Sequence, residues 1–329
     1  MLISRQAEAW IAARRPYPDE LEWAAENNAR MANSIRELPQ TLPIICSTLS
    51  DVKINESAPN PHVLSSLEKV LNGVRTSIFS LYQVTCLVRF DDGDTTSPSG
   101  LLEAFSANQL EQAITTSVIL AQIARPGSLG IAGGVVLVED KVFSTIPRQW
   151  FFYEMHSGDF RRSKWPQIDD LQLTKLCVWA KELGAFSSAV ARTRIQRTLA
   201  ALTHAISLPS SQSGETLFRA MQGLEAFFSD GTGDLRRQLS EKSQIWLGPS
   251  GQSKNVVGHL YDLRSSYVHG SANLDYPFGL RDSYEEDKLT SKKLSEAVEF
   301  AIRLLIATIQ RCAADRLFDL KWNYGYEAT

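Results

Sequence analysis

The sequence predicts a mainly α-helical protein, with an antiparallel helical bundle at the C-terminal end and a mostly helical N-terminal domain that carries a small β-hairpin. Three observations predict this class. Apolar residues recur at helical spacing along most of the chain, in stripes that would lie on one face of a helix. Strand-like patterns occur in one segment, and runs rich in Gly, Ser and Pro separate the stripes. The chain has 329 residues, enough for two ordinary domains. We expect an N-terminal domain over residues 1–186 and a C-terminal domain over 187–329.

Within residues 1–186 we expect three helices in addition to the one described next. The first covers residues 3–14, the second begins at the start signal Pro18-Asp19-Glu20, and the third covers 101–124. A further helix is predicted by a stripe at offsets of 4, 7, 11, 15 and 18, made by Val63, Leu67, Val70, Val74, Ile78 and Leu81. The exception is 135–146, where two β-branched runs around a polar centre predict a hairpin. The aromatic residues that follow it are expected to add a small sheet or lid.

The C-terminal domain shows helical stripes separated by short breaks at 208–214, 230–234 and 248–253. Two stripes have offsets of 4, 7 and 11, and a third is longer. Their members are Ile195, Leu199, Leu202 and Ile206; Leu217, Met221, Leu224 and Phe228; and Leu294, Val298, Ala301, Leu305, Ile309 and Cys312. This pattern is typical of an antiparallel bundle with short loops.

Charge and composition exclude several classes of protein. Lys and Arg total 34 against 37 Asp and Glu, a net charge of −3. A protein that coats nucleic acid, or that charge alone holds on an anionic membrane, would carry excess positive charge. The chain also shows no secretory signal, no run of about 18 apolar residues and no paired cysteine spacing. We therefore expect a cytoplasmic protein with reduced thiols and no membrane association.

The segment 253–273 carries the clearest functional signal. Its apolar residues predict a helix that contains Arg264 and His269, with four residues between them and Gly270 directly after. Five residues of ideal helix turn about 140°, so the two side chains would not share one face. Gly270 is a good left-handed terminator, which would let His269 lie in the last turn and swing toward Arg264.

An arginine and a histidine in this arrangement suit RNA cleavage. Histidine titrates near neutrality, so it can take a proton from a ribose 2′-hydroxyl or give one to a leaving 5′-oxygen. The donor fork of arginine matches a phosphate and stabilises its growing charge. No metal is needed, and DNA would be spared because it lacks the 2′-hydroxyl. The plain alternative is a helix end whose histidine is favoured by the macrodipole, with an ordinary surface arginine.

Three pieces of sequence carry a family resemblance: RIQRTLAALTHAIS at 194–207, ETLFRAMQGLEAFFSD at 215–230 and HLYDLRSSYVHG at 259–270. In kind, order and spacing they resemble the Apea-like branch of the HEPN superfamily, over about residues 187–318. The resemblance implies a helical bundle that dimerises and pairs two Arg-x4-His segments across a cleft, with one composite site per dimer. It implies no cofactor and no metal.

The resemblance also assigns roles to residues. Arg264 and His269 occupy the family's catalytic positions. Ser265 fills the position after the arginine, which is usually polar in the family and often Asn or Asp. Glu225 is the candidate for a carboxylate that orients the arginine, with a solvated glutamate as the alternative.

The function expected on this basis is that of a HEPN-type endoribonuclease in prokaryotic antiviral defence, or of a toxin, that leaves 2′,3′-cyclic phosphate ends. Its partners would be an RNA substrate, a second copy of the chain and an antitoxin or defence-system protein. Residues 1–186 would form a sensor, regulatory or partner-binding domain. The alternative is a non-catalytic HEPN module that binds nucleotide or RNA or serves as a dimerisation scaffold, which the near-neutral charge favours.

Other candidates carry less weight. The arginines that could supply phosphate contacts are Arg194, Arg197, Arg236 and Arg237. Gly130, Gly133 and Gly134 indicate a flexible hinge, since no Lys-Ser/Thr follows as in a phosphate loop. A metal site at Glu154, His156 and Asp159 lacks a second histidine at zinc spacing, so a polar loop is expected there. We expect His204 to be a packing residue and His259 a surface residue.

Overall fold

A computed structural model describes residues 3–14, 24–72, 74, 76–90, 100–149, 165–208, 213–231, 233–250, 256–271, 285–322 and 327–328. The chain divides into two compact units. One comprises Met1–Tyr153 and Asp170–Lys181, and the other comprises Glu154–Asp169 and Glu182–Thr329. Glu154–Asp169 therefore belongs with the C-terminal unit, whereas the sequence predicts a single boundary after residue 186.

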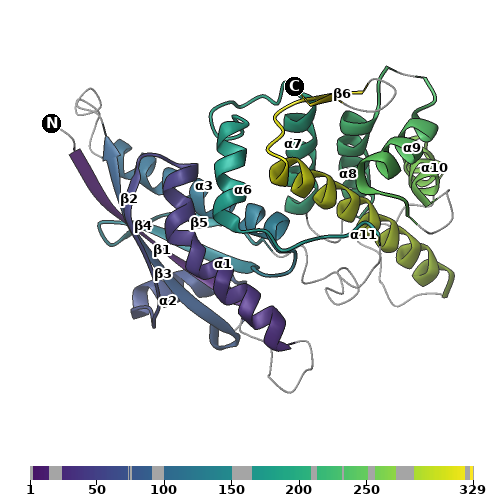
Figure 1. Cartoon of the computed structure of the whole chain (residues 1–329). Coiled ribbons are helices and arrows are strands. Elements are labelled where there is room, and N and C mark those ends of the chain that lie inside the picture. Colours follow the sequence, from purple (N-terminus) through teal and green to yellow (C-terminus); the bar gives the residue numbers. More distant parts are fainter. Residues whose placement is uncertain are drawn as a thin grey trace. The chain divides into compact units, whose positions relative to one another are not determined.

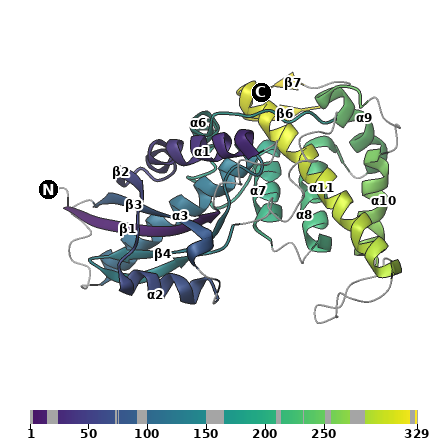
Figure 2. The same cartoon turned by 90° about the horizontal axis from the view of Figure 1, so that it is seen from below.

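The first unit is built on a five-stranded antiparallel sheet with the strand order β2-β3-β1-β4-β5 (Figure 1). Its strands are β1 (Ile3–Arg14), β2 (Leu49–Glu56), β3 (Phe79–Phe90), β4 (Ile131–Val138) and β5 (Lys141–Ile146). Its helices are α1 (Ala24–Ile45), α2 (Pro61–Val70), α3 (Leu101–Ala124) and α6 (Leu173–Glu182), with a 3-10 turn η1 (Thr76–Ile78) before β3. Figure 2 shows α1 and α2 on opposite faces of the sheet. The prediction of a mainly helical protein is therefore wrong, because this unit is mixed α/β.

The clearest error concerns residues 3–14, which form the central strand β1 and not a helix. Both faces of this strand are covered: Ala9 and Ile11 are buried on one face, and Trp10 on the other packs against Val63 and Leu67 of α2. A strand buried on both faces loses the alternating pattern that reveals a half-exposed strand. Its alanines then resemble a helix, but helix propensity is a weak preference that tertiary packing overrides.

The predicted helix over Val63–Leu81 is correct only in its first part. It is α2, which begins at Pro61 after an Asn60 N-cap whose side chain accepts a hydrogen bond from the Val63 N–H at 2.9 Å. The helix ends at Val70, Asn72 adopts a positive φ of 51°, and Leu81 already lies in β3. A left-handed residue stops the helix although the apolar spacing continues.

Other expectations for the first unit agree with the structure. The predicted helix over 101–124 is α3, and the predicted hairpin is β4–β5, with Glu139 and Asp140 at φ of 50° and 62° as a type I′ turn requires. The helix expected after Pro18 is described from Ala24 onward. The aromatic residues from 150 onward and the polar loop expected at Glu154, His156 and Asp159 lie outside the described residues.

Gly133 and Gly134 lie inside strand β4, so the expectation of a flexible hinge is wrong for them. A Cβ atom on Gly134 would lie 2.6 Å from the backbone oxygen of Trp10 in the neighbouring strand β1. The absence of a side chain therefore allows the close approach of two strands.

The second unit consists of helices α7 (Arg194–Ser207), α8 (Ser213–Phe228), α9 (Leu235–Leu247), α10 (Val256–Val268) and α11 (Glu285–Ala314), with the short pair β6 (Leu320–Lys321) and β7 (Glu327–Ala328). The stripes predicted from the sequence are the buried faces of α7, α8 and α11. A Cβ on Gly223 would lie 3.0 Å from both Ala201 and Leu305 side chains, so α7, α8 and α11 meet closely at this glycine.

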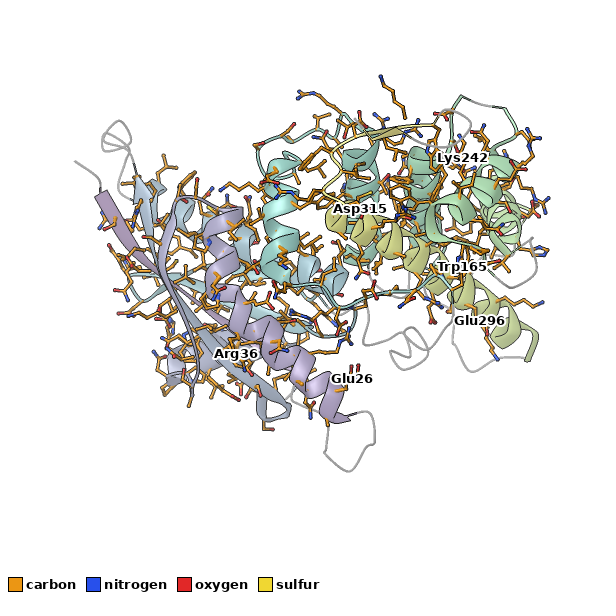
Figure 3. All side chains as sticks on the ribbon, in the orientation of Figure 1. Glu26, Arg36, Trp165, Lys242, Glu296 and Asp315 are labelled. Carbon is orange, nitrogen blue, oxygen red and sulfur yellow. The ribbon has the colours of Figure 1, made fainter. Side chains whose placement is uncertain are left out.

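A tryptophan far upstream in sequence completes this unit. Trp165, labelled in Figure 3, donates from its indole nitrogen to the carbonyl of Gly248 at 2.9 Å. Its ring centre lies 5.9 Å from that of Phe300 on α11, and Arg303 donates to the Trp165 carbonyl at 3.1 Å. These contacts explain why the segment before residue 170 belongs to the second unit.

Candidate functional site on helices α8 and α10

Helix α10 carries the Arg-x4-His segment and is anchored through its first half. Val257, Gly258 and Leu260 are buried. Gly258 leaves room for the guanidinium of Arg236 from α9, whose atoms lie 3.1–3.2 Å from the position that a Cβ would take. Arg236 also pairs with Asp262 at 3.0 Å. These contacts fix the register of α10 on α9.

The C-terminal end of α10 is a Schellman motif. Gly270 has a φ of 71°, its N–H donates to the Tyr267 carbonyl at 3.3 Å, and the Ser271 N–H donates to the Ser266 carbonyl at 2.9 Å. The prediction that Gly270 ends this helix in the left-handed conformation is confirmed. His269 follows the last helical residue and is exposed, and its backbone N–H donates to the carbonyl of Ser265 at 3.0 Å.

Arg264 points toward α8 and is held between two of its side chains. Its Nη2 atom lies 3.5 Å from Oε2 of Glu225, and its guanidinium carbon lies 5.6 Å from the ring centre of Phe218. The Arg264 side chain is 20% exposed and that of Glu225 is 19% exposed. The structure thus brings together two residues that are 39 positions apart in the sequence.

The Arg264–Glu225 pair is incompletely satisfied. Burial raises the pKa of the Glu225 carboxyl and outweighs the opposing effect of the Arg264 charge. In addition, Nε of Arg264 and Oε1 of Glu225 are both buried without a hydrogen-bond partner in the part of the chain that the structure describes. An arginine whose donors are only partly used can still bind an anion.

Four further residues on α8 and α10 were not predicted from the sequence: Gly214, Phe218, Arg219 and Tyr267. The Tyr267 ring lies against Gly214 in the first turn of α8, so close that an added Cβ would fall 2.1–2.5 Å from its atoms. The guanidinium carbons of Arg264 and Arg219 lie 5.6 Å and 5.7 Å from the centre of the Phe218 ring. The signal was present in the sequence, because Gly214, Phe218 and Glu225 are spaced by four and seven residues, as on one face of a helix.

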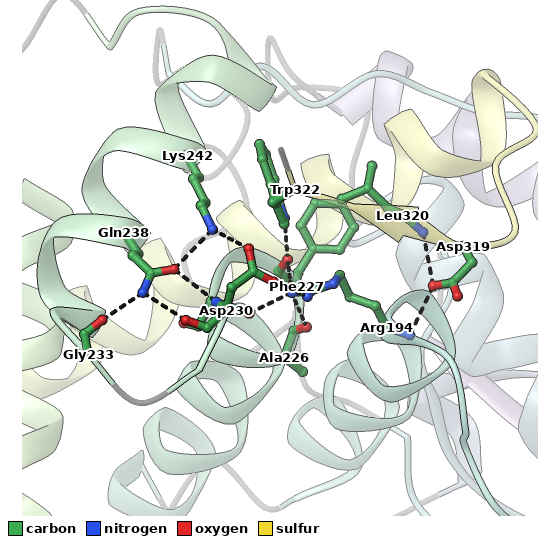
Figure 4. A network of polar contacts seen from close by, with 11 residues as sticks. Arg194, Ala226, Phe227, Asp230, Gly233, Gln238, Lys242, Asp319, Leu320 and Trp322 are labelled. Atoms are coloured by element: carbon green, nitrogen blue, oxygen red, sulfur yellow. Dashed lines mark hydrogen bonds and ion pairs between the residues drawn. The ribbon is translucent and has the colours of Figure 1, made fainter. Parts of the chain in front are cut away.

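Arg194, by contrast, is a structural residue and not a free phosphate ligand. Figure 4 shows its guanidinium at the C-terminal end of α8, where it donates to the carbonyls of Ala226, Phe227 and Ser229 at 3.2, 2.9 and 2.7 Å. It also pairs with Asp230 at 2.5 Å. The last carbonyls of a helix lack partners within the helix, so this arginine caps α8.

The same network ties α9 to the end of α8. Lys242 donates to Asp230 at 2.7 Å and to Gln238 at 2.9 Å, and Gln238 donates in turn to the Gly233 carbonyl at 2.6 Å (Figure 4). Burial raises the pKa of the Asp230 carboxyl, but the hydrogen bond from Lys242 and the charges of Arg194 and Lys242 outweigh this effect and leave the pKa below its ordinary value. The residues of this cluster therefore have a structural role, and the candidate functional site is formed by other residues of α8 and by α10.

The other arginines that were candidates for phosphate contacts make contacts within the unit. Arg236 pairs with Asp262, Arg237 pairs with Asp234 at 2.7 Å, and Arg197 donates to the carbonyl of Arg192. His259 is exposed as expected, whereas His204 is exposed and does not pack in the core. Among the described residues, no group of three His, Cys, Asp or Glu side chains could hold a metal ion. No described helix is long and apolar enough to cross a membrane.

Comparison with known proteins gives no relative: no family model, no curated protein and no solved structure matches this chain. The chemistry of the site therefore follows from its own residues. These are a half-buried arginine, an exposed histidine directly after the same helix and a carboxylate beside the arginine. Two partly buried aromatic rings lie on the same two helices, one near the arginine and one against Gly214.

Proposed function

We propose that this protein is a metal-independent endoribonuclease of the HEPN type, with Arg264 and His269 as its catalytic residues. The observation that carries the proposal is the arrangement of α10, which holds Arg264 against Glu225 while it leaves His269 exposed at a Schellman-capped end. The resemblance of residues 187–318 to Apea-like HEPN domains supports the same assignment.

The reaction proposed is transesterification within the RNA. His269 removes the proton from a ribose 2′-hydroxyl, and the resulting oxygen attacks the adjacent phosphorus. The bond to the 5′-oxygen of the next nucleotide breaks, and that oxygen takes up a proton. Arg264 stabilises the extra negative charge on the phosphoryl oxygens, since its fork of donors matches them. The products are a 2′,3′-cyclic phosphate and a 5′-hydroxyl. The backbone carbonyl of Ser265 accepts a hydrogen bond from the His269 N–H.

A second copy of the chain would complete the site. None of the residues from Tyr261 to Val268 on α10 is fully buried, and Val268 is 45% exposed. A twofold pairing of this half of the helix would cover it and bring two His269 side chains to one cleft, one to act as base and one as acid. We propose that the protein acts as this homodimer in the cytoplasm, in prokaryotic antiviral defence or as a toxin, with the first unit as its sensor or as the binding site for an antitoxin or defence partner.

The decisive experiment is an RNA-cleavage assay in the presence of EDTA with analysis of the product ends. We expect the wild type to cleave single-stranded RNA to 2′,3′-cyclic phosphate ends and to leave DNA intact. His269→Ala and Arg264→Ala should each lower the rate at least 100-fold, in line with general acid–base and charge-stabilisation effects. The matched control is His259→Ala, which removes an exposed histidine from α10 itself and should keep full activity. Full activity in His269→Ala would refute the mechanism.

One observation favours a second candidate, a non-catalytic HEPN module that binds RNA or nucleotide or serves as a dimerisation scaffold. Arg194, Arg236 and Arg237 are engaged in contacts within the unit, which leaves little positive field around the site. Overexpression in a bacterial host separates the two proposals. Growth inhibition by the wild type, but not by the Arg264→Ala/His269→Ala double variant, would exclude the non-catalytic module.

A further inference from the structure

The first two turns of α8 carry side chains beside Arg264 that the proposed reaction does not use. The guanidinium carbons of Arg264 and Arg219 lie 5.6 Å and 5.7 Å from the centre of the partly buried Phe218 ring. One aromatic ring is thus near two cations, one from each of two adjoining helices.

A second aromatic ring extends this surface along the seam between α8 and α10. Tyr267 follows Arg264 by three residues, and its partly buried ring lies on Gly214. Gly214 precedes Phe218 by four residues, so the two positions lie on the same side of α8. The order along the seam is therefore Tyr267 with Gly214, then Arg264 with Phe218.

Proteins bind single-stranded nucleic acid by stacking its bases on aromatic rings and by placing cations along its backbone. We infer that Phe218 and Tyr267 form a stacking subsite for the nucleobases that flank the scissile phosphate, and that Arg219 binds the neighbouring phosphate. This inference rests on the proposed function and names the substrate as single-stranded RNA. Because every base has a face that can stack, the subsite accepts many sequences.

Arg219 is an arginine beside Phe218 that the proposed reaction does not use. Its Nε donates to Glu215 at 2.9 Å and its Nη1 to Gln222 at 3.4 Å, and the side chain is 41% exposed. An exposed pair of this i,i+4 kind contributes little to stability, so a phosphate can displace it. The guanidinium has five N–H donors in all, and the two contacts leave some of them for a ligand.

The test measures binding of a short fluorescent single-stranded oligoribonucleotide to the full chain at several salt concentrations, with His269→Ala as the background so that the RNA stays intact. Phe218→Leu should weaken binding about tenfold and leave the salt dependence unchanged, because a stacking contact is lost and no charge is. Phe218→Tyr should bind as the background does. Tyr267→Leu should likewise weaken binding, and Tyr267→Phe should bind as the background does.

Arg219→Gln should change the salt dependence itself. Each phosphate contact adds about 0.7 to the slope of log affinity against log salt for a single strand, so the slope should fall by about that amount. The matched control is Arg237→Gln, which removes another exposed arginine in a local ion pair, on α9, and should leave the slope unchanged. Circular dichroism of each variant checks that it is folded.

The outcomes separate this inference from the proposed function. If cleavage depends on His269 but Phe218→Leu and Arg219→Gln bind RNA as the control does, the subsite is wrong and the ribonuclease stands. If His269→Ala cleaves like the wild type while Phe218→Leu loses binding, the subsite stands and the mechanism is wrong. If the background protein binds no single-stranded RNA, both proposals fail.

Discussion

The Tyr267 ring occupies the space that a side chain on Gly214 would need, since an ideal Cβ there would lie 2.1 Å from the nearest ring atom. This contact joins the last turn of α10 to the first turn of α8. It therefore holds the end of α10, where His269 is located, against the helix that carries Phe218 and Glu225.

Replacing Gly214 with alanine should displace Tyr267 and destabilise the protein. We expect a loss of about 1–3 kcal/mol in the free energy of unfolding, typical of an overpacked contact, although alanine has the higher helix propensity. Urea denaturation followed by circular dichroism measures this loss. Gly233→Ala is the control, because an added Cβ there meets nothing within 4 Å. Equal stability of the two variants would contradict the contact.

Removing the arginine that caps α8 should cost more than removing an exposed one. Arg194→Ala deletes hydrogen bonds to three carbonyls and the pair with Asp230, so we expect a loss of about 2–4 kcal/mol in unfolding free energy. Arg197→Ala on the same helix should cost under about 1 kcal/mol, since its side chain donates one hydrogen bond to a backbone carbonyl of the neighbouring turn. Chemical denaturation of both variants gives the comparison, and a cost for Arg194→Ala as small as that for Arg197→Ala would show that α8 does not depend on this cap.

Glu225 should make stability fall as the pH rises. Its pKa in the folded protein lies above the ordinary value of 4.5 because burial disfavours the carboxylate, so the folded state holds this proton more tightly than the unfolded state. The associated stability is present below the unfolded pKa and is lost as the pH rises through the folded pKa.

Glu225→Gln removes that titration. Urea denaturation at steps from pH 4 upward should therefore show the wild type losing stability relative to the variant as the pH rises above the ordinary carboxyl pKa of 4.5. A stability difference between the two proteins that is constant with pH would mean that burial does not perturb this carboxyl.

The close pairing of β1 and β4 should be sensitive to a single methyl group. Gly134→Ala places a Cβ 2.6 Å from the Trp10 backbone oxygen, and backbone in a sheet centre cannot move as a flexible side chain does. We expect a loss of about 1–3 kcal/mol in unfolding free energy. Thermal or urea denaturation measures this loss. Gly233→Ala is again the control, because an added Cβ there meets nothing within 4 Å.

Local sequence patterns were enough to predict the helices whose apolar residues face one core. The stripes at Ile195–Ile206 and Leu217–Phe228 are the buried faces of α7 and α8, and 101–124 is α3, because helical periodicity is a local property. Gly270 was recognisable as a helix terminator for the same reason. The pattern predicted a helix that contains Arg264, and this helix is α10, with His269 directly after its last residue.

The sheet and the partners of the site depend on contacts between distant parts of the chain. Residues 3–14 form a central strand because β3 and β4 pair with its two edges and α2 packs on its Trp10 face, which no local pattern records. The Arg264–Glu225 contact joins positions 39 apart, and the caps on α8 commit Arg194 to structure instead of to a ligand. Periodicity shows which face of a helix is buried, but the element that covers that face is chosen by packing of the whole chain.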